Sequence, residues 1–269
     1  MCRLVATMTE AVLEIQKNLE QHLEKREWEA ALGKLRALEL VGQHDPELER
    51  ALLLITDFMD ALRAKNYVGA AKTATDGWQR LGITQDGLEP ALAALLEAEA
   101  NWRIGESKVR AALTQALLHP LTRAEAENQL GVLQAVLENR DAARSHFQAA
   151  LAADPRHYRA MTNLGNLELE AGHLQEAESR YREVIRLNPD YSVVYNNLAA
   201  VMRKQGKRSE SVGYLKKAQS LSVREIRGDT RGTSVGKVKN PLSDWFAKPS
   251  SKWVLAGVLF LAAFLIYRR

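Results

Sequence analysis

The residues that most often carry out chemistry in proteins are scattered along this sequence. Six histidines occur among 269 residues, and none of them forms the His-Glu-x-x-His pair that binds zinc on a helix. The single cysteine, Cys2, excludes an internal disulfide and a cysteine-based zinc site. Residues 232–238 depart from the phosphate-binding loop pattern, because three residues instead of four separate the glycines and Val238 replaces the Ser or Thr. We therefore expect no enzyme activity, no cofactor and no metal.

Composition favours helices as the elements that position any functional side chain. Apolar residues make up 46% of the chain, which excludes disorder throughout. Glycine and proline are few, at 16 and 7 residues, which argues against a turn-rich sandwich or barrel. The abundant residues, such as Ala, Leu and Glu, are strong helix formers. These features predict an all-α protein.

Several residue types recur every 34 positions in the second half of the chain. The prolines Pro155 and Pro189 show this spacing, and each would end a helix. The same shift relates three further sets of positions: Leu130-Gly131, Leu164-Gly165 and Leu198-Ala199; Phe147, Tyr181 and Leu215; and Ala143, Ala177 and Ser211. Such self-similarity indicates stacked helix pairs, because one pair cannot bury its apolar face alone.

This pattern resembles the tetratricopeptide repeat, which carries a Leu-Gly pair, a small residue, a large apolar residue and a closing proline. The resemblance implies a right-handed superhelical solenoid of antiparallel helix pairs. Three clear copies are expected over 124–157, 158–191 and 192–225, which together form a 124–225 segment. Degenerate helix pairs are expected over 9–123, after a disordered start over 1–8.

The recurring apolar residues are expected to form the core. Gly131 and Gly165 lie in the middle of predicted helices, where glycine costs about 1 kcal/mol, so a neighbouring helix must approach closely there. The core residues expected from the repeat are Leu130, Leu164, Leu198, Phe147, Tyr181 and Leu215.

The resemblance also implies where a partner binds. In the resembled family, asparagines on the concave face bind the backbone of an extended peptide, because an amide both donates and accepts hydrogen bonds. The matching residues, with nearby aromatic and cationic side chains, are Asn128, Asn163, Asn166, Asn196, Asn197, Tyr195, Arg159, Arg203 and Lys204. A protein or peptide ligand is therefore expected in the concave groove. The alternative is that these asparagines only bond adjacent loops.

Residues 253–267, WVLAGVLFLAAFLIY, contain no charge. As a helix they would cover about 22 Å, which is less than the roughly 30 Å of a bilayer's hydrocarbon core. Their flanks extend this reach, because aromatic rings favour the membrane interface and long cationic side chains snorkel outward. The flanking residues are Lys252, Trp253, Tyr267, Arg268 and Arg269. The sequence predicts a transmembrane tail anchor over 252–269, with a buried core helix as the alternative.

The basic residues of the chain predict the orientation of this anchor. The net charge is +4, and residues 224–252 account for this excess. More cations precede the apolar run than follow it, so the positive-inside rule places the N-terminal domain in the cytoplasm. We expect a basic flexible linker over 226–251, a single membrane pass and no nucleic-acid partner. The Ala/Leu/Arg-rich composition favours a bacterial inner membrane.

These inferences predict a membrane-anchored adaptor that recruits a protein or peptide through a cytoplasmic solenoid. One alternative is an assembly or organelle-remodelling factor, since short basic-ended anchors look like those of mitochondrial outer-membrane proteins with this repeat. Another alternative is an uncharacterised enzyme for which the solenoid is only a scaffold.

Overall fold

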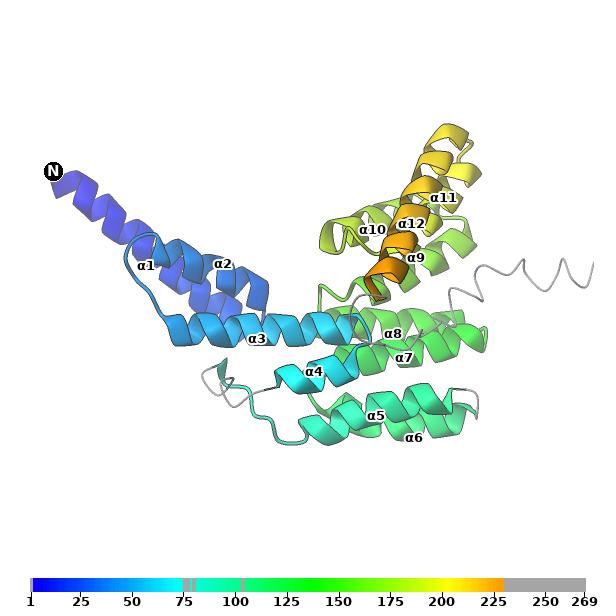
Figure 1. The fold of residues 1–269 in the computed structure, drawn as a ribbon, viewed down its shortest axis with the longest axis horizontal. Helices are drawn as coiled ribbons and strands as arrows, with labels where there is room; N and C mark the ends of the chain where they lie inside the picture. Colours follow the sequence, from blue (N-terminus) through cyan, green and yellow to red (C-terminus); the bar gives the residue numbers. More distant parts are fainter. Residues whose placement is uncertain (1, 75–77, 79–80, 103–104, 230–269) are drawn as a thin grey trace, which may run out of the picture. The chain divides into compact units, whose positions relative to one another are not determined.

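A computed structural model describes residues 2–74, 78, 81–102 and 105–229 of the chain. Within these residues every regular element is a helix, so the all-α prediction is confirmed (Figure 1). The helices are α1 (Cys2–Glu24), α2 (Trp28–Glu39), α3 (Pro46–Arg63), α4 (Tyr67–Thr73), α5 (Leu88–Asn101), α6 (Glu106–Leu118), α7 (Arg123–Val136), α8 (Arg140–Ala153), α9 (Tyr158–Ala171), α10 (Leu174–Leu187), α11 (Ser192–Lys204) and α12 (Arg208–Asp229).

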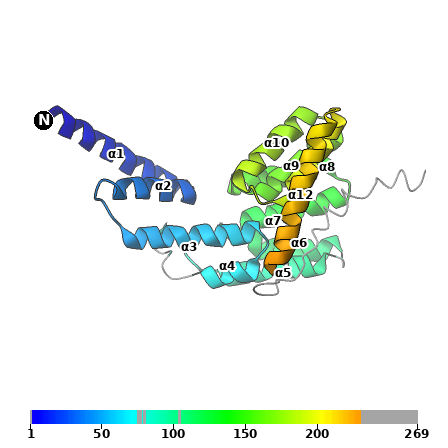
Figure 2. The same cartoon turned by 45° about the horizontal axis from the view of Figure 1, so that its top comes forward.

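Successive helices are arranged as pairs, as in tetratricopeptide repeats. The helices α1 and α2 pack side by side in both views (Figures 1 and 2), and so do α3 and α4, α5 and α6, α9 and α10, and α11 and α12. Between pairs, the second helix of one pair packs on the first helix of the next, as α2 does on α3 and α10 on α11. The pairs α9–α10 and α11–α12 begin at the residues where the 34-residue spacing places the second and third copies.

Local sequence explains where individual helices begin and turn. Asp45 caps α3, since its side chain accepts a hydrogen bond of 3.0 Å from the Leu48 amide. Gly172 and Gly206 adopt φ angles of 86° and 79° between paired helices, in a region that glycine enters without steric strain.

The described chain divides into two compact units. Unit 1 contains Met1–Leu130 together with Ala149–His157, and unit 2 contains Gly131–Gln148 and the described residues from Tyr158 onward. The division falls inside α7 and α8, so neither unit is a continuous stretch of sequence.

The core of unit 2 explains the helical glycines. A Cβ atom added to Gly165 would lie 2.6 Å from the nearest ring carbon of Tyr181, and one added to Gly131 would lie 2.5 Å from the Phe147 ring. Both rings are buried. The close approach that the sequence predicts at these glycines is therefore present, and a large aromatic side chain fills the space that each glycine leaves.

Leu215 departs from the expected core. Its 34-residue counterparts Phe147 and Tyr181 are 1% and 0% exposed, whereas Leu215 is 45% exposed. It lies on α12, the last helix of the last described pair, where no further helix pair covers this face. The prediction that Leu215 is a core residue is wrong for this reason. The other five expected core residues, Leu130, Leu164, Leu198, Phe147 and Tyr181, are buried.

Two segment boundaries also differ from the expectation. Helix α1 begins at Cys2, so residues 2–8 are helical rather than disordered, because no helix-breaking residue separates Cys2 from Thr9. Helix α12 continues to Asp229, into the expected 226–251 linker, because Val223 stands where a proline closes the other copies. Within the described residues no helix is both long and apolar enough to cross a bilayer. The predicted anchor over 252–269 lies outside the described residues.

Candidate functional site

The candidate partner-binding residues of α11 are accessible to a ligand. Asn196, Arg203 and Lys204 are exposed, and Asn197 is half-buried. Their positions at i, i+1, i+7 and i+8 place them along one side of the helix, together with the half-buried Val193 and Ala200. This side of α11, which we call the α11 face, combines two amides with two cations.

The candidate residues of α9 lie in a different environment. Arg159, Asn163 and Asn166 are each 7% exposed. The Asn166 side-chain oxygen accepts a hydrogen bond of 2.7 Å from the Tyr181 hydroxyl and one of 2.8 Å from the Asn197 amide. Asn166 therefore joins α9 to both α10 and α11, which is a structural role within unit 2. In unit 1, Asn128 on α7 is fully buried.

Tyr195 is held within the α11 pair. Its hydroxyl donates a hydrogen bond of 2.8 Å to the Pro189 carbonyl, and the Lys217 ammonium lies 6.0 Å from its ring centroid. Burial raises the pKa of Tyr195, and the nearby Asp190 carboxylate adds to this effect. The side chain is 7% exposed, so Tyr195 anchors the start of α11 and leaves little surface for a ligand.

A carboxylate that the sequence analysis does not identify is strongly bound in unit 2. Glu168 accepts a hydrogen bond of 2.5 Å from Arg144 and lies 2.9 Å from the ring nitrogen of His173. The hydrogen bond from Arg144 is the main reason that the pKa of Glu168 is lowered. Arg144 and His173 lie 24 and 5 positions from Glu168 in the sequence, and no spacing of the repeat indicates these contacts.

Unit 1 contains a buried ion cluster around Arg63. Its guanidinium binds Asp154 through two hydrogen bonds of 2.8 and 2.9 Å, and it also contacts Glu29 at 2.8 Å and Asp60 at 2.9 Å. The side chains of Arg63 and Asp154 are both 5% exposed. Burial alone would raise the pKa of Asp154, but the hydrogen bonds and charge of Arg63 outweigh it and hold that pKa below its usual range.

A second buried polar cluster lies in the same unit. The Glu125 carboxylate accepts a hydrogen bond of 2.6 Å from the Tyr67 hydroxyl and lies 3.0 Å from the His157 ring nitrogen, while Gln129 donates one of 2.8 Å to Tyr67. All four residues are at most 3% exposed. Because solvent and ligands cannot reach these groups, the cluster serves to join α4, α7 and the segment that precedes α9.

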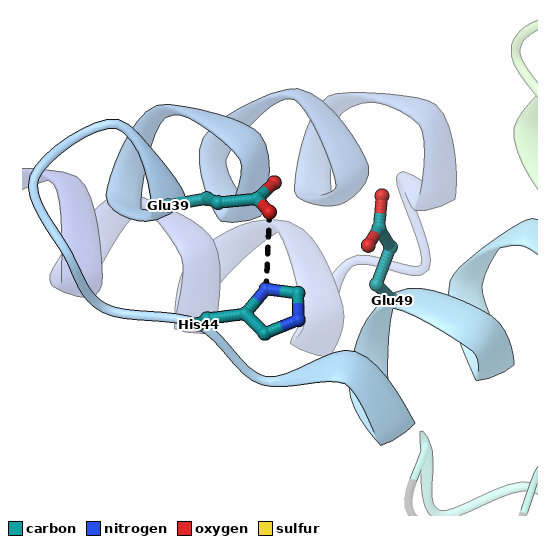
Figure 3. A group of neighbouring side chains, drawn as sticks. All are labelled: Glu39, His44 and Glu49. Carbon is teal, nitrogen blue, oxygen red and sulfur yellow. Dashed lines mark ion pairs between the residues drawn. The ribbon is translucent and has the colours of Figure 1, made fainter.

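Three potential metal ligands meet at the surface of unit 1. Figure 3 shows Glu39, His44 and Glu49 around the α2–α3 loop, with donor atoms that all lie within 4.8 Å of one another. His44 Nδ1 is 3.2 Å from Glu39 Oε1, and Glu49 is 3.5 Å from the Arg36 guanidinium. The His44 and Glu39 side chains are about half exposed, at 49% and 48%. This arrangement is an exposed ion-pair network, and the guanidinium beside Glu49 opposes binding of a second cation there.

A groove of about 530 Å³ lies between α4 and α5 in unit 1. It is lined mainly by apolar side chains, including those of Tyr67, Val68, Leu92 and Leu96. The groove forms because α4 has only 7 residues and covers only part of α5, which has 14. Val68 and Leu96 remain 56% and 43% exposed at its rim.

The paired helices, the glycine–aromatic contacts and the exposed α11 face define a helical repeat protein of the kind that presents a binding surface. Residues 128–192 and 162–221 match the family model described as tetratricopeptide repeat. Residues 128–221 are thus similar to tetratricopeptide repeats. Proteins of this class are generally protein-interaction scaffolds and are typically non-catalytic.

Comparison with solved structures finds matches at low sequence identity and with TM-scores below 0.5. A crystal structure of MamA is 22% identical with a TM-score of 0.43, covering 64% of this chain and 98% of its own. A second MamA structure is 19% identical with a TM-score of 0.40, covering 70% and 99%. A tetratricopeptide repeat protein from Parabacteroides merdae is 19% identical with a TM-score of 0.40, covering 78% and 80%. No curated protein sequence matches the chain.

Proposed function

We propose that this protein is an interaction scaffold that recruits an extended, acidic peptide segment of a partner to a membrane surface. The observation that carries the proposal is the α11 face, where Asn196, Arg203 and Lys204 are exposed within tetratricopeptide repeats. An exposed amide can pair with a peptide backbone, and two cations at the end of the same helix favour carboxylates. Asn166 supports this face, because its side-chain oxygen accepts a hydrogen bond from the Asn197 amide.

The binding surface is narrower than the sequence alone suggests. Asn197 already donates its amide hydrogen to Asn166, and Asn166 has Tyr181 as a second partner. Of the candidate asparagines, Asn196 is the one whose side chain is exposed. Backbone recognition is therefore assigned to Asn196, and selection of acidic side chains to Arg203 and Lys204.

Changing the α11 face is expected to weaken peptide binding without unfolding the protein. The variant Asn196→Ala/Arg203→Ser/Lys204→Ser should bind a fluorescent pool of Asp/Glu-rich peptides at least about tenfold more weakly, since each lost hydrogen bond is worth about 0.5–1.5 kcal/mol. The matched control is Gln115→Ala/Lys108→Ser/Arg110→Ser, which removes one amide and two cations from exposed positions on α6. Fluorescence anisotropy measures the affinity. Equal affinity in both variants, or no binding by the unmodified chain, contradicts the proposal.

Membrane attachment is assigned to residues 253–267. The support is their sequence, an uncharged apolar run between Lys252 and the pair Arg268 and Arg269. The positive-inside rule assigns residues 1–252 to the cytoplasmic side, and the composition favours a bacterial inner membrane. A mitochondrial outer-membrane assembly factor is the second candidate, favoured by the terminal arginine pair. Changing Arg268 and Arg269 to Ser should mislocalise the chain only in the second case.

Removal of the apolar run is expected to abolish membrane attachment. The full chain should float with anionic lipid vesicles in a sucrose gradient and resist extraction at high salt and at alkaline pH. A chain that lacks 253–269 should stay at the bottom of the gradient and keep its helical circular dichroism, since the described core lies upstream. Co-flotation of the shortened chain would assign attachment to another part of the protein.

A further inference from the structure

The last described helix carries apolar side chains that the described residues leave exposed. Val212, Leu215 and Val223 on α12 are 51%, 45% and 40% exposed. Their spacing of i, i+3 and i+11 puts them on one side of the helix, and we call these three residues the α12 strip. The end of a helical repeat array normally presents a polar face to water.

The repeat register identifies what belongs on this strip. Leu215 is the counterpart of Tyr181 on α10, and α10 packs on α11, the first helix of the following pair. The same kind of junction joins α2 to α3 and α4 to α5. In each case the second helix of one pair packs on the first helix of the next pair. The α12 strip is therefore shaped to receive the first helix of another pair.

The first helix of the chain has the complementary surface. Leu13 on α1 is 59% exposed, and the exposed Lys17, Glu20 and Glu24 follow it on the same side of the helix at i+4, i+7 and i+11. Residues 10–24 contain four acidic side chains and one basic side chain, counting Glu, Asp, Lys and Arg. This face of α1 thus presents a leucine and a net negative charge.

The charges on α12 have the opposite sign. The exposed cations Arg208 and Lys216 lie one helical turn before and after Val212, and so border the α12 strip. Over residues 208–224 the helix has four basic side chains and one acidic side chain. Opposite charge around matched apolar surfaces favours one orientation of two partners and raises their association rate.

We infer that two copies of this chain associate head to tail, with α1 of one copy packed on the α12 strip of the other. The contact repeats the second-helix-on-first-helix junction already present within the chain. Because the contact uses two different surfaces, a pair of copies keeps one free α1 face and one free α12 strip, so the contact extends into an open array or a closed ring. The inference goes beyond the proposed function and does not depend on the α11 face or on residues 253–267.

Disulfide trapping tests which helices meet. In a Cys2→Ser background, one sample of the full chain in mild detergent carries Leu13→Cys and a second, differently tagged sample carries Leu215→Cys. After mixing and mild oxidation, the disulfide between positions 13 and 215 should form in a yield at least about tenfold higher than the disulfide between two copies of the same variant. The control pairs Leu118→Cys with Leu215→Cys, because Leu118 on α6 is 74% exposed but belongs to neither surface. The inference is overturned if position 215 cross-links mainly to position 215 of another copy. It is also overturned if the cross-link between positions 13 and 215 is no more abundant than the control cross-link.

Sedimentation velocity of the full chain without new cysteines provides the second measurement. The average mass should rise with protein concentration, and Leu215→Glu should raise the dissociation constant at least about tenfold while Leu118→Glu leaves it unchanged. Association should also weaken as the salt concentration rises, since the Debye length falls from about 10 Å at 0.1 M to about 3 Å at 1 M. A monomer at all concentrations, or equal effects of the two glutamates, contradicts head-to-tail association.

Discussion

Replacing Asp154 with leucine is expected to lower the free energy of unfolding of unit 1 by about 3–5 kcal/mol, because it leaves the buried Arg63 guanidinium without its two-bond partner. Glu29 and Asp60 would still contact the Arg63 guanidinium, but both are more exposed than Asp154 and contribute less. Urea denaturation followed by tryptophan fluorescence measures this loss, since Trp28 and Trp78 are buried in unit 1. A loss below about 1 kcal/mol would mean that solvent reaches this ion pair.

Two further variants separate the ion pair from general packing. Arg63→Met/Asp154→Leu should lose much less stability than the sum of the two single changes, because the double change leaves neither charge buried alone. Arg182→Met should change stability by no more than about 0.5 kcal/mol, because Arg182 and Glu178 form a partly exposed i,i+4 pair on α10.

Acid should reduce the difference between the Asp154→Leu variant and the unmodified chain. The pKa of Asp154 is held below its usual value in the folded protein, so the carboxylate contributes its full stability above the unfolded pKa of about 3.9. That contribution is lost as the pH falls through the lower folded pKa.

Replacing Gly165 with alanine is expected to destabilise unit 2, although alanine is the better helix former. The new Cβ would lie 2.6 Å from the buried Tyr181 ring, and overpacking of this kind costs about 1–3 kcal/mol. The gain in helix propensity is about 1 kcal/mol and offsets only part of this loss. Gly165→Leu should destabilise more, because a larger side chain meets the same ring. Thermal unfolding followed by circular dichroism measures both changes.

Gly213 provides the matched control for Gly165. It lies inside α12, and a Cβ atom added there would have no neighbouring atom within 4 Å. Gly213→Ala should therefore raise the stability by up to about 1 kcal/mol, through helix propensity alone. If the two alanine variants have the same effect, the contact between Gly165 and Tyr181 does not constrain the packing of α9 on α10.

The sequence predicts the fold well where local rules act between neighbouring helices. The 34-residue spacing places the helix pairs of residues 158–225, and the mid-helix glycines at 131 and 165 indicate the close contacts found there. The same spacing fails at Leu215, because a residue type shows that a position suits burial but not that a neighbouring helix is present to bury it.

The candidate site could be predicted only in part. Repeat position groups Asn196, Arg203 and Lys204, and the structure shows that all three are exposed on α11. It also includes Asn163 and Asn166, which are buried, since the residue type of an asparagine is the same whether it meets a ligand or a neighbouring helix. The contact between Arg63 and Asp154 could not be predicted, because 91 residues separate them and a simple solenoid brings together only adjacent repeats.

The discontinuous composition of unit 1 has a consequence for the order of events during biosynthesis. Ala149–His157 completes this unit, so a nascent chain that has emerged only as far as α7 lacks Asp154, the carboxylate that forms two hydrogen bonds with Arg63. At about 5–20 residues per second, translation of the 91 residues between Arg63 and Asp154 takes about 5–18 seconds. During this interval the α3–α4 segment stays incompletely folded on the ribosome. We therefore expect a chaperone that binds nascent polypeptides to bind this segment during that interval.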